Sequence, residues 1–214
     1  MLYSLAKAII NFVFIVYFRR RIEGLENIPA QGGCLIAVNH LSYADPLLVG
    51  LACPRPVHFM AKAELFRVPL LKSILPRLHA FPVRRGAADR QAIRKALELL
   101  QNGAVLGVFP EGTRNRQRQS DGDMLPLHGG AAMLALRTGV PVVPAAVWGT
   151  GRIAGPLGLP KPVKIGIRFG QPINLPPPEQ VNKESVAEAS RTIMEAIKNV
   201  LDEVDPQQHR QGGA

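Results

Sequence analysis

Three short apolar runs constrain the fold of this chain more than any other feature. They cover residues 34–38, 104–109 and 142–147, and none of them contains a charged side chain. A short continuous run of this kind is typical of a strand that is buried on both faces, as in a parallel sheet. Stretches with helical spacing lie between the runs. The sequence therefore predicts an α/β fold with helices flanking a mixed, largely parallel central sheet.

Helix start and stop signals support this interpretation. Asp89 is expected to cap a helix over residues 90–101, and a shorter helix is expected over residues 130–137, ahead of a glycine. Towards the end of the chain, Ser185 and Glu188 have the spacing of a capping box and introduce a stripe of apolar residues. Such a stripe is far more often a packing surface than a partner site.

The chain begins with 18 mostly apolar residues, which three arginines at positions 19–21 follow. This length is at the short limit for spanning a bilayer. The aromatic residues before the arginines are typical of an anchor at the cytoplasmic headgroup boundary. A buried core helix is the alternative, and the sequence does not distinguish a segment that spans the bilayer from one that lies in its plane.

The length of 214 residues suits one domain with a sizeable core and not two. We expect an N-terminal membrane-anchoring helix with its arginine cluster over residues 1–21. A single domain is expected over residues 22–204, and a flexible tail over residues 205–214.

A histidine and an aspartate follow the first apolar run, where a buried strand of an α/β sheet tends to place a site. His40 and Asp45 are five residues apart, about 140° around an ideal helix, so a loop could pair them but a continuous helix would not. The carboxylate could then hold one imidazole nitrogen while the other faces a substrate hydroxyl, as in general-base catalysis. The structural alternative is that Asp45, which precedes Pro46, caps a helix, and both roles are compatible.

The second apolar run ends in the hexapeptide Phe-Pro-Glu-Gly-Thr-Arg at residues 109–114. Its proline and glycine favour a turn, and Gly112 lets the backbone approach a ligand closely. Arg114 offers a planar fork that suits phosphate, and Glu111 can accept hydrogen bonds from hydroxyls or position the arginine. An ordinary turn with a surface ion pair is the alternative.

Together, these two groups of residues resemble the motifs of the glycerolipid acyltransferase family. The family's His-x4-Asp box matches His40 and Asp45, and its Phe-Pro-Glu-Gly-Thr-Arg box matches residues 109–114 without a change. Two further blocks are similar and stand in the same order, the first at residues 59–66 with 82–86 and the second at residues 140–145.

The resemblance covers roughly residues 22–170, and it has one departure. After Pro126 the family often carries an aromatic residue and basic residues before a glycine, whereas this chain has Leu127 and His128 before Gly129. We therefore assign no contact with the acceptor to this segment.

The resemblance implies transfer of a fatty acyl group from an acyl thioester, either acyl-CoA or acyl-carrier protein, to the free sn-2 hydroxyl of lysophosphatidate, giving phosphatidate. His40 would be the general base and Asp45 would orient its ring. Acceptor phosphate and glycerol would be held by Lys62, Arg84, Arg85, Glu111, Gly112, Thr113 and Arg114. The family needs no metal and no bound cofactor. The alternative acceptors are another lysolipid or glycerol 3-phosphate.

Direct transfer is expected, without an acyl-enzyme. The sequence contains no Gly-x-Ser-x-Gly motif, and neither Cys34 nor Cys53 has an obvious activating partner.

The net charge of +10 is concentrated in the middle of the chain. Residues 55–118 carry 13 basic and 4 acidic side chains, a net charge of +9, which a solvated basic face or an anionic partner would explain. A nucleic-acid-binding module is the less favoured alternative, because only 6% of residues are aromatic. We expect a protein on the cytoplasmic face of the cell membrane, with a membrane lipid, an anionic membrane surface and a thioester donor as partners, and no nucleic acid.

Overall fold

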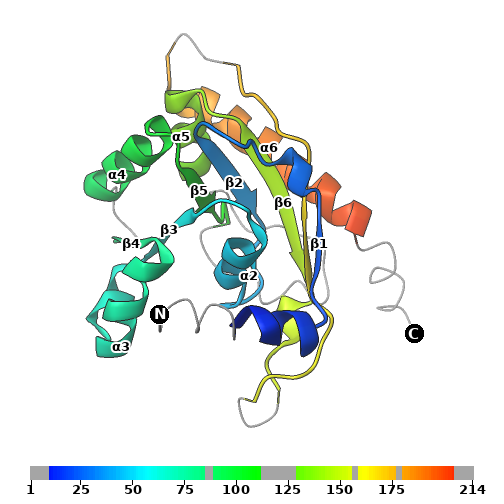
Figure 1. Cartoon of the computed structure of the whole chain (residues 1–214). Helices are drawn as coiled ribbons and strands as arrows, with labels where there is room; N and C mark the ends of the chain where they lie inside the picture. Colours follow the sequence, from blue (N-terminus) through cyan, green and yellow to red (C-terminus); the bar gives the residue numbers. More distant parts are fainter. Residues whose placement is uncertain (1–9, 85–88, 112–128, 156–158, 177–179, 205–214) are drawn as a thin grey trace.

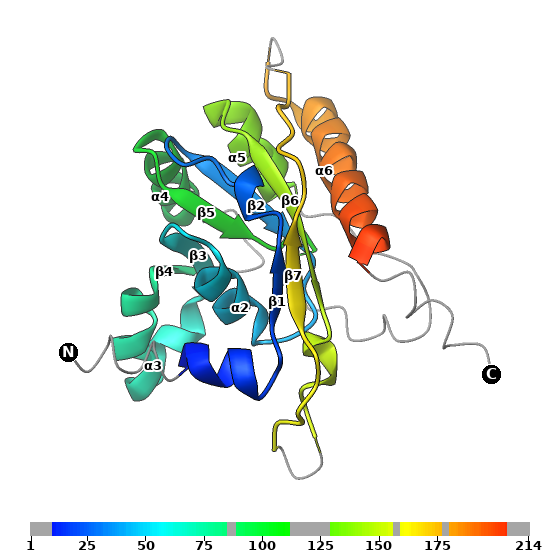
Figure 2. The same ribbon diagram turned by 45° about the vertical axis from the view of Figure 1, so that its right-hand side comes forward.

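The structure is a computed structural model that describes residues 10–84, 89–111, 129–155, 159–176 and 180–204. Within these residues seven strands form one sheet in the order β1-β7-β6-β2-β5-β3-β4 (Figures 1 and 2). The strands are β1 (Arg21–Glu23), β2 (Cys34–Val38), β3 (Val57–Lys62), β4 (Ala80–Val83), β5 (Val105–Val108), β6 (Val142–Trp148) and β7 (Gly166–Phe169).

Helices connect the strands. The α-helices are α2 (Asp45–Ala52), α3 (Pro69–Ile74), α4 (Arg90–Gln101), α5 (Gly130–Thr138) and α6 (Lys183–Val204). In the described ranges, four short 3-10 turns accompany them: η1 (Leu25–Asn27), η2 (Ala63–Arg67), η3 (Pro76–Leu78) and η4 (Thr150–Arg152). A further helical segment over residues 10–16 begins the described part of the chain.

The sheet is mixed and mostly parallel, which confirms the predicted fold class. β2 lies at its centre, parallel to β5 on one side and to β6 on the other. β3 and β4 continue the parallel part beyond β5. β7 pairs antiparallel with β6, and β1 runs parallel to β7 at the far edge. The carboxyl ends of β2, β5, β3, β4 and β6 therefore meet along one edge of the sheet.

Both faces of the sheet are covered, as the apolar runs require. All five residues of β2 are buried, and they alternate between two core clusters. Ile36 belongs to the cluster beneath α2, with Leu48 and Phe14, whereas Leu35 belongs to the cluster beneath α4, α5 and α6. Figure 2 shows α2 and α6 on opposite sides of the sheet.

The helix signals in the sequence hold for two of the three helices. Asp89 caps α4, because its side chain accepts hydrogen bonds from the backbone amides of Gln91 and Ala92. α5 begins at Gly130 as expected.

The predicted capping box of the last helix is wrong. α6 begins at Lys183, so Ser185 lies inside its first turn. The reciprocal pair is Asn182 with Ser185: the Ser185 amide donates to Asn182 Oδ1 at 2.9 Å, and the Asn182 amide donates to Ser185 Oγ at 3.0 Å. A capping box joins two polar residues three positions apart. Ser185 is the second member of this pair, and Asn182 is the first.

The segment predicted to anchor the chain is only partly described, since residues 1–9 lie outside the described ranges. The helical turns over residues 10–16 divide their apolar side chains between two environments. Phe14, with Phe18 just beyond, is buried against the core, while Phe12 and Val16 are exposed. No helix within the described residues combines the length and the hydropathy needed to cross a bilayer. The predicted tail at residues 205–214 also lies outside the described residues.

Candidate active site

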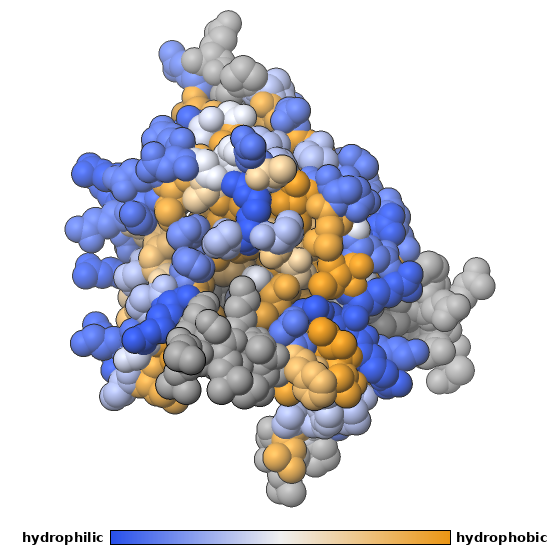
Figure 3. Space-filling model, viewed as in Figure 1, coloured by the Kyte–Doolittle hydropathy of each residue, from blue (hydrophilic) through white to orange (hydrophobic). Residues whose placement is uncertain are grey.

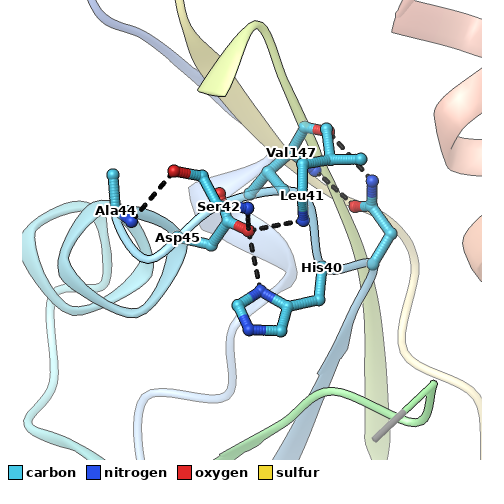
Figure 4. Close-up of polar contacts among 7 residues, drawn as sticks. His40, Leu41, Ser42, Ala44, Asp45 and Val147 are labelled. Carbon is cyan, nitrogen blue, oxygen red and sulfur yellow. Dashed lines mark hydrogen bonds and ion pairs between the residues drawn. The ribbon is translucent and has the colours of Figure 1, made fainter. Parts of the chain in front are cut away.

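His40 and Asp45 are paired at the carboxyl end of the central strand. His40 comes two residues after the end of β2, and Asp45 is the first residue of α2. The loop between them turns back, so that His40 Nδ1 lies 2.8 Å from Asp45 Oδ2 (Figure 4). Both residues are buried, and the exposed fractions of their side chains are 11% for His40 and 0% for Asp45. The pairing through a loop is the arrangement that the five-residue spacing allows.

Three donors converge on one oxygen of Asp45. Besides the His40 ring, the backbone amides of Leu41 and Ser42 each donate to Asp45 Oδ2 at 2.7 Å. Short hydrogen bonds from several donors are typical of an ionised carboxylate. A carboxylate at Nδ1 fixes the proton there, which leaves Nε2 of the neutral ring as a proton acceptor.

Asp45 does not cap α2, so the capping interpretation is wrong. The N-cap residue is Ala44, which makes no side-chain capping bond, and the carboxylate points back to the loop instead of forward to the helix amides. Within this loop the Ala44 amide donates to Ser42 Oγ at 3.3 Å (Figure 4). The loop is thus shaped by short polar contacts that bring the aspartate to the imidazole.

Asn39 ties the end of β2 to β6. Its side-chain amide donates to the Val147 carbonyl at 3.0 Å, and the Val147 amide donates to Asn39 Oδ1 at 2.7 Å. These bonds extend the pairing of the two strands past Val38, the last β2 residue in the ladder. No role for Asn39 was predicted from the sequence. The sequence does indicate a hydrogen-bonding role, because a polar residue that directly follows an all-apolar buried strand needs partners.

An aromatic stack covers the His40 ring. The Phe109 ring lies nearly parallel to it, with centroids 4.1 Å apart and an interplanar angle of 25°. Phe59 from β3 lies behind Phe109, with centroids 6.2 Å apart and an angle of 17°. Gly107 of β5 makes room for this stack, because a Cβ at that position would overlap the Phe59 ring. Both phenylalanines lie within the motif blocks at residues 59–66 and 109–114, but their contact with the histidine joins distant strands and was not predicted from the sequence.

The other predicted site residues that the structure describes lie at the same edge of the sheet. Glu111 follows β5 and is 1% exposed. Lys62 ends β3, and its half-exposed amine is 3.5 Å from the Glu64 carboxylate. Arg84 follows β4, and its backbone amide donates to Asp89 Oδ2 at 2.9 Å. Arg85, Gly112, Thr113 and Arg114 are outside the described residues.

The strand order arranges these residues in a row. Passing from β2 through β5 and β3 to β4, the carboxyl ends carry His40, Glu111, Lys62 and Arg84 in turn. With about 4.8 Å between neighbouring strands, the row extends roughly 14 Å from the histidine to the last arginine. It begins at a buried base and ends at exposed cations, an arrangement that suits a substrate with a reactive hydroxyl and an anionic group. Among the described residues no group of His, Cys, Asp or Glu has the arrangement of a metal site.

Comparisons with known proteins agree with this geometry. Residues 19–148 match the Acyltransferase family. The chain is 31% identical over 192 residues to 1-acyl-sn-glycerol-3-phosphate acyltransferase of Bacillus subtilis (strain 168), an alignment that covers 86% of this chain and 89% of that protein. It is 33% identical over 140 residues to the chloroplastic 1-acyl-sn-glycerol-3-phosphate acyltransferase BAT2 of Brassica napus, covering 64% of this chain and 39% of that protein.

A solved structure is similar over nearly the whole chain. It is the crystal structure of the 1-acyl-sn-glycerophosphate (LPA) acyltransferase PlsC from Thermotoga maritima, with a TM-score of 0.68 and 26% sequence identity. The likeness covers 95% of this chain and 83% of that one. The range matched to the family runs from just before β1 to the end of β6, and it contains every predicted site residue.

Proposed function

Because this chain belongs to the acyltransferase family, we propose that it transfers a fatty acyl group from an acyl thioester to the free sn-2 hydroxyl of lysophosphatidate, giving phosphatidate. The observation that carries the proposal is the buried pair at the end of the central strand, with His40 Nδ1 2.8 Å from Asp45 Oδ2. This pair supplies a base whose second nitrogen is available to a hydroxyl group.

In the proposed reaction, Nε2 of His40 takes the proton of the sn-2 hydroxyl as the oxygen attacks the thioester carbonyl carbon. The tetrahedral intermediate then collapses, the carbon–sulfur bond breaks, and the donor thiolate leaves with the proton from the imidazolium. Asp45 holds the ring in the correct tautomer and stabilises its positive charge while the proton is in transit.

The acceptor headgroup is proposed to lie along the row of strand ends. Glu111, Lys62 and Arg84 are the described residues there, and Arg85, Gly112, Thr113 and Arg114 complete the proposed site. Two cations beyond a buried carboxylate suit a phosphate joined to a glycerol hydroxyl. The same geometry suits other lysolipids, so the acceptor is the part of the proposal that needs the sharpest test.

Direct transfer agrees with the state of the two cysteines. Burial raises the pKa of the Cys34 thiol to about 12, and burial also raises the pKa of Cys53. A thiol that stays protonated at neutral pH is a poor nucleophile. We therefore propose that no acyl group passes through either sulfur.

The proposed acceptor is a membrane lipid, so we propose that the chain works at the cytoplasmic membrane surface. The exposed apolar side chains of the helical segment at residues 10–16 support this location, with Phe12 65% and Val16 57% exposed. Aromatic and aliphatic side chains in such positions bind at the boundary between headgroups and acyl chains.

An acceptor panel tests the proposed function. The full chain is incubated with radiolabelled acyl-CoA or acyl-carrier protein and with lysophosphatidate, lysophosphatidylcholine or glycerol 3-phosphate, and the lipid products are separated. We expect phosphatidate from lysophosphatidate as the main product, with His40→Ala lowering its rate by at least about 10³-fold. His79→Ala, which changes an exposed histidine, serves as the matched control. Transfer to another acceptor but not to lysophosphatidate would refute the substrate, and near-full activity of His40→Ala would refute the mechanism.

A further inference from the structure

The connection between β3 and β4 is apolar in composition but buries none of its residues. It comprises η2, α3 and η3, and every residue from 63 to 79 is half-buried or exposed. Its large apolar side chains are Leu65, Phe66, Val68, Leu70, Leu71, Ile74, Leu75 and Leu78. A helical segment of a globular domain ordinarily buries an apolar stripe, whereas this one leaves Leu70 at 69% exposure and Val68 at 46%.

Basic residues are interspersed with these apolar side chains along the connection. Arg67, Lys72 and Arg77 are exposed, and Glu64 is the one acidic residue between β3 and β4. Exposed apolar side chains flanked by basic ones are typical of segments that bind the interface of an anionic bilayer. The charge therefore distinguishes this connection from an ordinary surface loop.

The connection projects at the same end of the molecule as the candidate active site. It starts from Lys62, at the carboxyl end of β3, and α3 lies at the lower edge in Figure 1. Other exposed apolar side chains belong to segments at this end: Phe12 lies in the helical segment that leads into β1, Tyr43 in the loop after β2 at 69% exposure, and Leu159 between β6 and β7 at 67%. Figure 3 shows hydrophobic surface on either side of the lower part of the molecule.

Leu25 lies elsewhere and provides a contrast. It follows β1, which runs opposite to β2, so it lies towards the amino ends of the parallel strands. Its exposed fraction is 40%, close to the 38% of Ile74 on α3. A comparable side chain is therefore available away from the active-site end.

We propose that residues 63–78 are a membrane-contact segment, in which Val68, Leu70 and Ile74 enter the interface of an anionic bilayer while Lys72 and Arg77 contact lipid headgroups. The exposed apolar side chains at this end come from separate elements and those of the connection are flanked by basic residues, a combination that suits the interface of an anionic bilayer. With the helical segment at residues 10–16, the chain would then contact the bilayer at two points beside the active site. The proposal takes one premise from the proposed function, namely that the acceptor is a membrane lipid.

Vesicle binding tests the segment directly. The full chain is mixed with vesicles of phosphatidylcholine containing phosphatidylglycerol, and the bound fraction is measured by flotation. We expect the double variant Leu70→Ser/Ile74→Ser to bind at least about tenfold more weakly, since two apolar side chains no longer enter the interface. Leu25→Ser should bind like the wild type. Transfer to lysophosphatidate in vesicles should fall with binding, while transfer to a short-chain, water-soluble lysophosphatidate should be unchanged.

A fluorescence measurement covers the case in which the N-terminal segment dominates binding. In Leu70→Trp, emission should shift to shorter wavelength when vesicles are added, after subtraction of the wild-type signal from the native Trp148. Leu25→Trp should show no such shift. In Lys72→Ser/Arg77→Ser, the dependence of binding on phosphatidylglycerol content should weaken.

Several results would overturn the proposal. The first is that Leu70→Ser/Ile74→Ser binds vesicles like the wild type and that Leu70→Trp shows no shift in emission. The second is that the double variant keeps vesicle binding but loses self-association. The third is that it keeps vesicle binding but loses binding of acyl-carrier protein. The last two would assign the segment to a second copy of the chain or to a protein partner. Vesicle binding as predicted, with no acyl transfer to any lysolipid, would retain the contact segment and refute the proposed function.

Discussion

The imidazole of His40 is held along one edge and across one face. Asp45 accepts the hydrogen bond at Nδ1, and the Phe109 ring lies 4.1 Å from the imidazole centroid. The first contact sets the tautomer and the second limits rotation of the ring. Neither contact uses Nε2, which therefore remains available to an acceptor hydroxyl.

Replacing Asp45 by asparagine should separate the charge of this residue from its shape. In Asp45→Asn the side-chain oxygen can still accept from the Leu41 and Ser42 amides, but a neutral amide stabilises an imidazolium far less. We expect kcat to fall by about 10²- to 10⁴-fold with little change in the acceptor KM. Steady-state kinetics measures this effect. Glu98→Gln, which removes an exposed carboxylate on α4, is the control and should leave kcat unchanged.

The aromatic stack can be tested from its base. In Gly107→Ala the new methyl group overlaps the Phe59 ring, which must move and disturb Phe109 and His40. We expect a loss of roughly 1–3 kcal/mol in the free energy of unfolding, together with a lower kcat. Gly50→Ala is the matched control, because its Cβ would lie 3.9 Å from the same ring in ordinary contact. Urea unfolding and kinetics on both variants decide the matter, and equal behaviour of the two would contradict the role of the stack.

At the scale of elements, the sequence predicted the central strands and the parallel sheet well but not its edges. The three apolar runs correspond to β2, β5 and β6, with ends that differ by at most one residue. β5 is as short as β4, but it lies within a continuous apolar run, whereas β1 carries Arg21 and Glu23 and β4 contains Pro82, so neither edge strand has such a run. Such strands form because a longer neighbour supplies the hydrogen bonds, which is tertiary information.

In the candidate site, too, contacts between residues close in sequence could be predicted and contacts between distant residues could not. The His40–Asp45 pair could be predicted because the two residues lie close in sequence and a loop between them can bring their side chains together. The Phe59–Phe109–His40 stack and the Asn39–Val147 bonds join residues that are far apart along the chain. Which strands become neighbours decides these contacts, and local patterns do not contain that information.

The cap of α4 makes stability depend on pH in a defined direction. Hydrogen bonds from the backbone amides of Arg84 and Ala92 lower the pKa of Asp89. Because the pKa of Asp89 is lower in the folded chain than in the unfolded chain, the ionised carboxylate stabilises the fold. This stabilisation is present above the unfolded pKa of about 4, and it is lost as the pH falls from there through the lowered pKa of the folded chain. We expect Asp89→Ala to lower the Tm at pH 7, and the difference from wild type to shrink below about pH 4. Asp89→Ser, which retains a capping oxygen, should recover part of the loss. A constant difference across this pH range would contradict the capping role.

At the scale of the whole molecule, the reactivity of the two thiols measures whether the core is folded. Cys34 lies in the central strand and Cys53 follows α2, and both are buried. Since burial raises the pKa of Cys34 to about 12, this thiol stays protonated at neutral and mildly alkaline pH and is a poor nucleophile. We expect iodoacetamide to label the native chain very slowly and the urea-unfolded chain quickly, as measured by intact mass. An acyl adduct on either cysteine after incubation with acyl-CoA would contradict direct transfer.

The row of strand ends has a consequence for how the molecule opens. His40 and Asp45 adjoin β2, which has hydrogen-bonded neighbours on both sides, whereas Arg84 follows β4 at the edge. Edge elements exchange their amide hydrogens through small local fluctuations, while a central strand exchanges mainly through global unfolding. In mild denaturant, β4 amides should therefore lose protection before those of β2. The acceptor KM should rise in the same range of denaturant, ahead of any fall in kcat, because the proposed headgroup-binding residues adjoin the less protected strands of the sheet.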